Sequence, residues 1–97
     1  MSQDSRRYYG IIPANVRHDK ELKPNAKLLY CELTTLIDKE GYCFENNDYF
    51  AKLYQVSKET ISRLIGQLEK RGYIKTEIIY KEGTKEIKGR SIQIKKI

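Results

Sequence analysis

A chain of 97 residues can form one hydrophobic core of modest size, but not two. Its content of 39% hydrophobic and 33% charged residues is typical of a soluble globular domain and excludes a disordered segment. No apolar run approaches the roughly 20 residues that span a bilayer, and the N-terminal residues lack the apolar region of a signal peptide. We therefore expect a cytoplasmic protein with no membrane partner.

The net charge of +6 is unevenly distributed along the chain. Residues 1–57 hold eight basic and eight acidic side chains, whereas residues 58–97 hold eleven basic and five acidic ones. All of the excess positive charge therefore lies in the second segment. An excess confined to one segment indicates a surface that binds a polyanion, although a lysine-rich surface can also serve solubility alone.

The cysteines and the single histidine do not indicate a metal site. Cys31 and Cys43 form no C-x-x-C motif, and His18 is far from both in sequence. We expect two free thiols, because disulfides are rare in a reducing cytoplasm. We also expect no cofactor and no enzymatic activity, since the sequence has no glycine-rich phosphate loop and no cysteine–histidine pair at a motif spacing.

Residues 1–21 are expected to form an N-terminal arm, and residues 22–97 the folded domain. The apolar stretch Tyr8–Pro13 could be a strand, or a segment that packs on the core or on a second subunit. The following residues, Pro13–Arg17, could form one helical turn. Leu22 is expected to be buried.

Pro24 begins the first long helix, because its missing N–H costs nothing at the first helical position. We expect this helix to continue to Gly41. Leu28 and Cys31 lie off its apolar stripe and could face a partner or a second layer, which is a hint of dimerisation. The stripe itself predicts core packing and consists of Ala26, Leu29, Leu33, Leu36 and Ile37.

A pair of short helices is predicted between Asn47 and Gly72, after a short strand at Tyr42–Phe44. Asn46 or Asn47 caps the first helix, and Ser57 caps the second, because these side chains can accept a hydrogen bond from an unpaired N–H of the first turn. Gly72 ends the second helix in a left-handed conformation. One face of the second helix is apolar and consists of Ile61, Leu64, Ile65 and Leu68.

After Gly72 the hydrophobic period changes from 3.6 to 2, which predicts a β-hairpin. The expected strands are Tyr73–Lys81 and Arg90–Ile97, joined by the polar connection Lys81–Gly89. The connection and its flanks are basic, with Lys81, Lys85, Lys88 and Arg90.

This order of elements is that of an α+β winged helix-turn-helix, with three main helices, a short strand and a C-terminal hairpin as the wing. The second helix of the pair would then enter the major groove, where Arg63 could bond guanine and Gln67 adenine. Gly66 would leave room for the DNA backbone, and the basic wing would neutralise phosphates. The predicted contacts on this recognition helix are Ser57, Lys58, Thr60, Ser62, Arg63 and Gln67.

Two stretches resemble a known group of winged-helix domains, namely LKPNAKLLYCELTTLIDKEGYCF and YFAKLYQVSKETISRLIGQLEKRGYI. They are similar to the N-terminal domains of RepA-type plasmid replication initiators of Gram-positive bacteria, to phage replisome organisers and to DnaD-like primosome proteins. MarR-like regulators share the form of the second stretch, whereas PNAKLLY followed by GYCF favours the replication group.

The resemblance implies a homodimer that binds double-stranded DNA sequence-specifically at repeated sites of a plasmid or phage origin. It also implies a longer native protein, in which a C-terminal region beyond Ile97 recruits host replication proteins. Two alternatives stay open. A transcriptional regulator of the same fold would normally carry its own dimerisation helices or effector domain, and a protein-interaction module of a primosome would not need the segregated positive charge.

Overall fold

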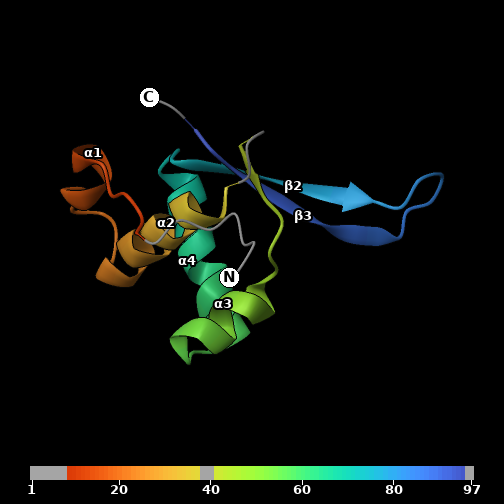
Figure 1. Ribbon diagram of the computed structural model, residues 1–97, viewed down its shortest axis with the longest axis horizontal. Helices are drawn as coiled ribbons and strands as arrows, with labels where there is room; N and C mark the ends of the chain where they lie inside the picture. Colours follow the sequence, from red (N-terminus) through yellow and green to blue (C-terminus); the bar gives the residue numbers. More distant parts are fainter. Residues whose placement is uncertain (1–8, 38–40, 96–97) are drawn as a thin grey trace.

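The structure, a computed structural model, describes residues 9–37 and 41–95 of the chain. In these residues four helices accompany a three-stranded antiparallel sheet with β3 at its centre, in the order β1-β3-β2 (Figure 1). None of these helices is both long enough and apolar enough to cross a membrane. The elements are α1 (Ala14–Arg17), α2 (Pro24–Leu36), β1 (Tyr42–Cys43), α3 (Asn47–Tyr54), α4 (Lys58–Lys70), β2 (Ile74–Tyr80) and β3 (Ile87–Ile94).

Helix α2 begins at Pro24 as predicted, but it ends at Leu36, and the expectation that it reaches Gly41 is wrong. Ile37 already has an extended backbone, and the rest of the predicted extension, residues 38–40, lies outside the described residues. The cause lies in the last turn, where Thr34 and Thr35 donate their hydroxyls to the carbonyls three residues earlier, at 2.6 and 2.8 Å. Such bonds compete with the helical ladder, and these residues are β-branched.

The caps of α3 and α4 are those that the sequence predicts. Asn46 Oδ1 accepts a hydrogen bond from the Tyr49 N–H at 3.0 Å, and Ser57 Oγ accepts one from the Thr60 N–H at 3.0 Å. Between the two helices, Gln55 adopts a left-handed conformation with φ of 59°. This turn sets α4 at a steep angle to α3 (Figure 1).

Helix α4 ends in a Schellman motif around Gly72, which has φ of +83°. The Gly72 N–H donates to the Glu69 carbonyl at 2.9 Å, and the Tyr73 N–H donates to the Leu68 carbonyl at 3.0 Å. Strand β2 follows at Ile74, so the hairpin is attached directly to the end of α4.

The core lies where α2, α3 and α4 meet one end of the sheet. The predicted apolar faces of α2 and α4 supply much of it, and Leu22 is buried as expected. The N-terminal segment also packs on α2, because the Ile11 N–H donates to Thr34 Oγ1 at 2.9 Å. The largest fully buried side chains are Phe50, Leu29, Leu33, Ile61, Leu68, Ile74, Ile92, Val16 and Cys43.

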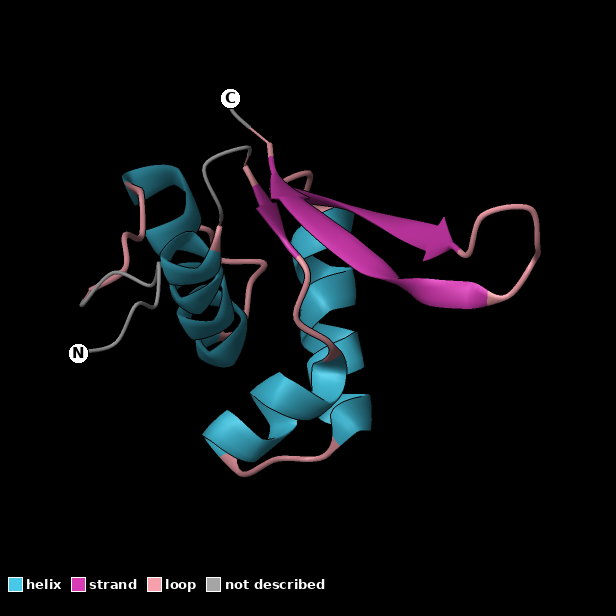
Figure 2. Cartoon of the chain, turned by 45° about the vertical axis from the view of Figure 1, so that its right-hand side comes forward, coloured by secondary structure: helices cyan, strands magenta, loops and turns pink. Residues whose placement is uncertain are grey.

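The hairpin differs from its prediction at both ends of its second strand. Strand β3 ends at Ile94 instead of Ile97, and residues 96–97 lie outside the described residues. Strand β3 begins at Ile87 instead of Arg90, because a β-bulge between the pairs Ile79–Gly89 and Tyr80–Ile87 lets pairing continue past the glycine. The turn is therefore shortened to residues 81–86, and Lys88 is the extra residue of the bulge. Figure 2 shows the hairpin extending well past the helices. The fold is the predicted winged helix-turn-helix, with β2 and β3 as the wing.

Candidate nucleic-acid interface

The surface of α4 that faces away from the core forms the centre of the site. The apolar face of α4 is buried, which turns the polar face to solvent. Thr60 and Gln67, at its edge, are half-buried. The exposed residues of this face are Lys58, Glu59, Ser62, Arg63, Gly66 and Lys70.

In the part of the chain that the structure describes, the bond that holds Arg63 comes from its own helix. Its Nη2 donates to Thr60 Oγ1 at 3.3 Å, and Thr60 Oγ1 also accepts a hydrogen bond from the Ser57 hydroxyl at 3.0 Å. Over residues 9–37 and 41–95, no carboxylate forms an ion pair with this guanidinium. Its remaining N–H groups are therefore available for a bidentate contact with an acceptor outside the chain.

Unlike Arg63, Gln67 has a side chain that is already engaged with another helix. Its Oε1 accepts a hydrogen bond from the backbone N–H of Lys23 at 3.4 Å, at the start of α2. A bidentate bond to adenine uses both the oxygen and the nitrogen of the amide. Gln67 would have to give up this long bond to read adenine in that way.

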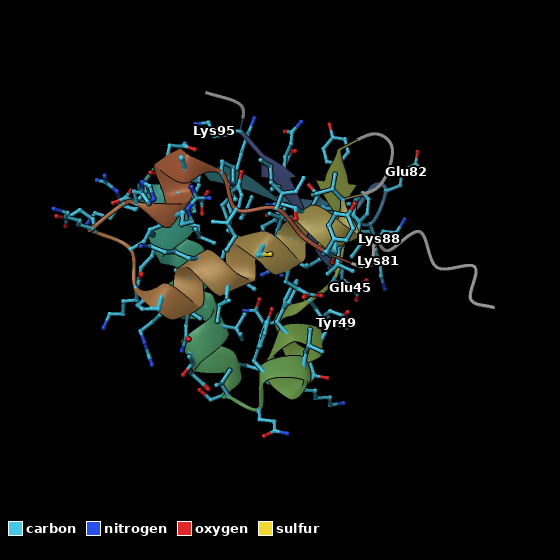
Figure 3. All side chains as sticks on the ribbon, turned by 60° about the vertical axis from the view of Figure 1, so that its left-hand side comes forward. Glu45, Tyr49, Lys81, Glu82, Lys88 and Lys95 are labelled. Carbon is cyan, nitrogen blue, oxygen red and sulfur yellow. The ribbon has the colours of Figure 1, made fainter. Side chains whose placement is uncertain are left out.

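The wing turn carries less net positive charge than the sequence suggests. Residues 81–86 contain two lysines and two glutamates, and Lys81 Nζ forms an ion pair with Glu86 Oε1 at 3.3 Å. Lys85 and Lys88 are exposed and have no ion-pair partner in the described part of the chain. Figure 3 shows Lys81, Glu82 and Lys88 in one region of the hairpin, far from Lys95 at the other end of β3.

Arg90 does not belong to the exposed basic tip, and its expected placement there is wrong. Its Nη1 donates to Asn47 Oδ1 at 2.6 Å, and its Nη2 donates to the Glu45 carbonyl at 2.8 Å. Its Nε is buried, and burial lowers the pKa of this guanidinium from its ordinary value. The side chain therefore fastens the central strand of the sheet to the start of α3.

Sequence reasoning missed a part of the surface that the start of α2 contributes. Lys23, Pro24 and Asn25 line an open depression together with Thr60, Arg63 and Gln67, and we call it the α2–α4 hollow. The balanced charge of residues 1–57 concealed it, because the hollow has no acidic residue in its lining although the segment as a whole is neutral. A local signal did exist, since Lys23 directly precedes Pro24, the predicted first residue of the helix.

A family model described as a helix-turn-helix domain matches residues 20–74, more than half of the chain and all of α2, α3 and α4. The chain belongs to this helix-turn-helix family. No curated protein and no solved structure shows significant similarity to the chain. Membership in the family indicates DNA binding, and such domains are typically not enzymes.

In this helix-turn-helix domain, the buried carboxylate of Asp19 holds the C-terminal end of α4. Asp19 Oδ2 accepts hydrogen bonds from the Tyr73 hydroxyl at 2.6 Å and from Arg71 Nε at 3.0 Å, and Asp19 Oδ1 accepts one from the Glu21 N–H at 2.8 Å. The bond from Tyr73, more than any other, lowers the pKa of Asp19 from 3.8 to about 2. Arg71 is thereby drawn away from the exposed face of α4.

Other reactive groups of the helix-turn-helix domain have ordinary structural positions. Cys31 and Cys43 are not joined in a disulfide, as expected. The Tyr54 hydroxyl donates to Glu32 Oε1 at 3.3 Å, and its pKa is raised by burial and by the nearby Glu32 carboxylate. Within the described residues no three His, Cys, Asp or Glu side chains gather as metal ligands would.

Proposed function

We propose that this helix-turn-helix domain binds double-stranded DNA sequence-specifically at repeated sites of a plasmid or phage replication origin, as the DNA-binding domain of a replication initiator. The observation that carries DNA binding is the exposed polar face of α4 beside a wing, with Arg63 paired to no carboxylate of the described residues. The origin assignment is supported by the resemblance of residues 22–44 to the replication group.

In the proposed complex α4 lies in the major groove, which is wide enough to admit a helix. Arg63 bonds guanine, while Ser62 and Lys58 contact bases or phosphates along the same face. Ser57 and Thr60 present their hydroxyls at the helix N-terminus, where partial positive charge favours a phosphate oxygen. Lys81, Lys85 and Lys88 neutralise phosphates from the wing, and Gln67 contributes through its amide nitrogen.

Two partner proposals accompany this function. A homodimer would match repeated or palindromic sites, and Tyr9, Ile11 and Leu28 are exposed apolar residues suited to its interface. We also propose that a region following the wing in a longer native protein recruits host replication proteins.

The test is footprinting on the DNA that carries the gene, with a salt titration and an unrelated duplex as competitor. We expect protection of repeated sites in or near the coding region, at salt concentrations that abolish binding to the unrelated duplex. If the protein binds DNA but protects no such repeat, the origin assignment fails. If it binds no duplex in a salt-dependent manner, DNA binding fails as well, and a protein-interaction role would take its place.

A transcriptional regulator is the second candidate, because the family match covers the helix pair that both classes share. It predicts a protected site that overlaps a promoter. Deleting that site would change transcription and leave plasmid or phage copy number unaffected.

A further inference from the structure

The α2–α4 hollow has a composition suited to an anion. It is open, with a volume of about 640 Å³, and its polar lining comes from two separate segments, the start of α2 and one edge of α4. Lys23 and Arg63 are cationic, Asn25 and Thr60 can donate hydrogen bonds, and none of the lining residues is acidic. The wing turn, by contrast, has equal numbers of lysines and glutamates.

The position of the hollow relative to α4 gives it a defined place in a DNA complex. Arg63 and Gln67 follow Thr60 by three and seven residues, so all three lie along one flank of the helix. Glu69 lies on the other flank, where it accepts a hydrogen bond from the Thr76 hydroxyl of β2 at 3.1 Å. The exposed face of α4 is therefore bordered by the start of α2 on one side and by the wing strand on the other.

A helix in the major groove has the backbone of one DNA strand on each side. The groove is about 12 Å wide and a helix with side chains is about 10–12 Å across, so both flanks come close to phosphates. We propose that the α2–α4 hollow binds a backbone phosphate of the strand opposite to the one that the wing contacts, with Lys23 as its principal cation. The inference rests on the proposed DNA binding and extends the interface to a segment outside the helix pair.

A hydrogen bond sets the position of the start of α2 relative to α4. The Lys23 N–H bond to Gln67 fastens the start of α2 to α4, while the Lys23 side chain itself is exposed. Because the bond involves the backbone of Lys23, replacing its side chain leaves the attachment in place. Lys23→Ala therefore removes the cation with little disturbance of the fold.

The first experiment measures the salt dependence of binding of the whole 97-residue chain to its cognate duplex. Lys23→Ala should reduce the slope of log K against log salt by about 0.9, the value for one lost phosphate contact. Lys20→Ala is the matched control, since Lys20 is also exposed and belongs to the same segment but does not line the hollow. It should leave the slope unchanged, and thermal unfolding should show that both variants are folded.

The second experiment locates the phosphate by ethylation interference. The wild-type chain should show two groups of phosphates, one on each strand beside the bases read by α4. Lys23→Ala should lose interference at one group, and Lys85→Ala at the other. Inorganic phosphate should compete with the duplex no better than sulfate at equal ionic strength, because a free anion lacks the register that α4 provides.

Each result bears on the proposal. Equal slopes for Lys23→Ala and Lys20→Ala, or loss of the same phosphates in Lys23→Ala and Lys85→Ala, would overturn the assignment of the hollow while DNA binding stood. Selective competition by inorganic phosphate would replace it with a site for a free anion. A wild-type chain that binds no duplex would overturn the proposed function itself. The salt titration of the wild-type chain shows this outcome before any variant is compared.

Discussion

Arg63 and Arg90 carry the same guanidinium group, but their surroundings differ. Arg63 lies on an exposed helix face and, among the described residues, bonds to Thr60 of its own helix, whereas Arg90 bonds to Asn47 and to the Glu45 carbonyl. A half-buried guanidinium that has two protein acceptors cannot turn to DNA without breaking both bonds. We therefore propose that Arg63 serves recognition, whereas Arg90 attaches the wing to the start of α3.

Replacing Arg63 should weaken binding to the cognate site more than to other DNA. Arg63→Ala is expected to cost about 1–3 kcal/mol there, because a bidentate contact to guanine is lost, and to relax discrimination at that base pair. Gel shifts on the cognate site and on single-base variants measure both effects. Lys70→Ala removes a charge from the same face and serves as the control. An equal loss for Arg63→Ala on random duplexes would show that Arg63 contacts phosphate only.

A substitution at Gly66 should affect folding stability and DNA binding in opposite directions. A Cβ at this position would have open space around it, with no atom within 4 Å other than the local backbone of its own helix, and glycine inside a helix is unfavourable relative to alanine. Gly66→Ala should therefore raise the free energy of unfolding by about 0.5–1 kcal/mol. If DNA approaches α4 closely here, the same variant should bind every duplex more weakly. A more stable variant with unchanged affinity would argue that Gly66 faces open solvent in the complex.

At the scale of elements, the wing should supply affinity without sequence preference. Lys85→Ala and Lys88→Ala should each weaken binding to all duplexes similarly and reduce the salt slope by about 0.9, since each removes one phosphate contact. Fluorescence anisotropy at several salt concentrations measures the slope. Lys95→Ala, at the far end of β3, should have no effect. A slope that stays at the wild-type value in both wing variants would remove the hairpin from the interface.

The helix pair could be predicted from the sequence because its determinants are local. The caps Asn46 and Ser57 act on N–H groups three residues later, and Gly72 acts on the turn just before it. The early start of β3 has a different origin. The bulge that lets β3 start early depends on its pairing with β2, and the alternation of residues around Lys88 does not predict that pairing.

The candidate site was less predictable than the fold, because two of its determinants join distant residues. Arg90 bonds to Asn47 across 43 positions, and Lys23 bonds to Gln67 across 44. Residue type and spacing identified the exposed face of α4. They did not distinguish a charge that meets a protein acceptor from one that meets solvent, and they did not bring the start of α2 beside the recognition helix.

At the scale of the whole molecule, Asp19 should make the stability of the fold depend on pH in the acidic range. Its pKa of about 2 in the folded chain lies below the ordinary 3.8, so its ionised form stabilises the fold. This contribution is complete above pH 3.8 and is lost as pH falls towards 2. Asp19→Asn should lower the Tm at pH 7, and the difference from wild type should shrink over that acid range in thermal unfolding scans. A difference that is constant from pH 7 to 2 would mean that the charge of Asp19 contributes nothing.

The carboxylate of Asp19 also determines where this domain can be cut. The family match begins at residue 20, and the expected folded domain at residue 22, so both boundaries exclude Asp19. A fragment that starts at either position would keep α2, α3 and α4, yet leave the Tyr73 hydroxyl and the Arg71 guanidinium without their shared acceptor. We therefore expect the smallest stable fragment to include Asp19, which makes this part of the segment before the matched family a support of the helix-turn-helix rather than an appendage.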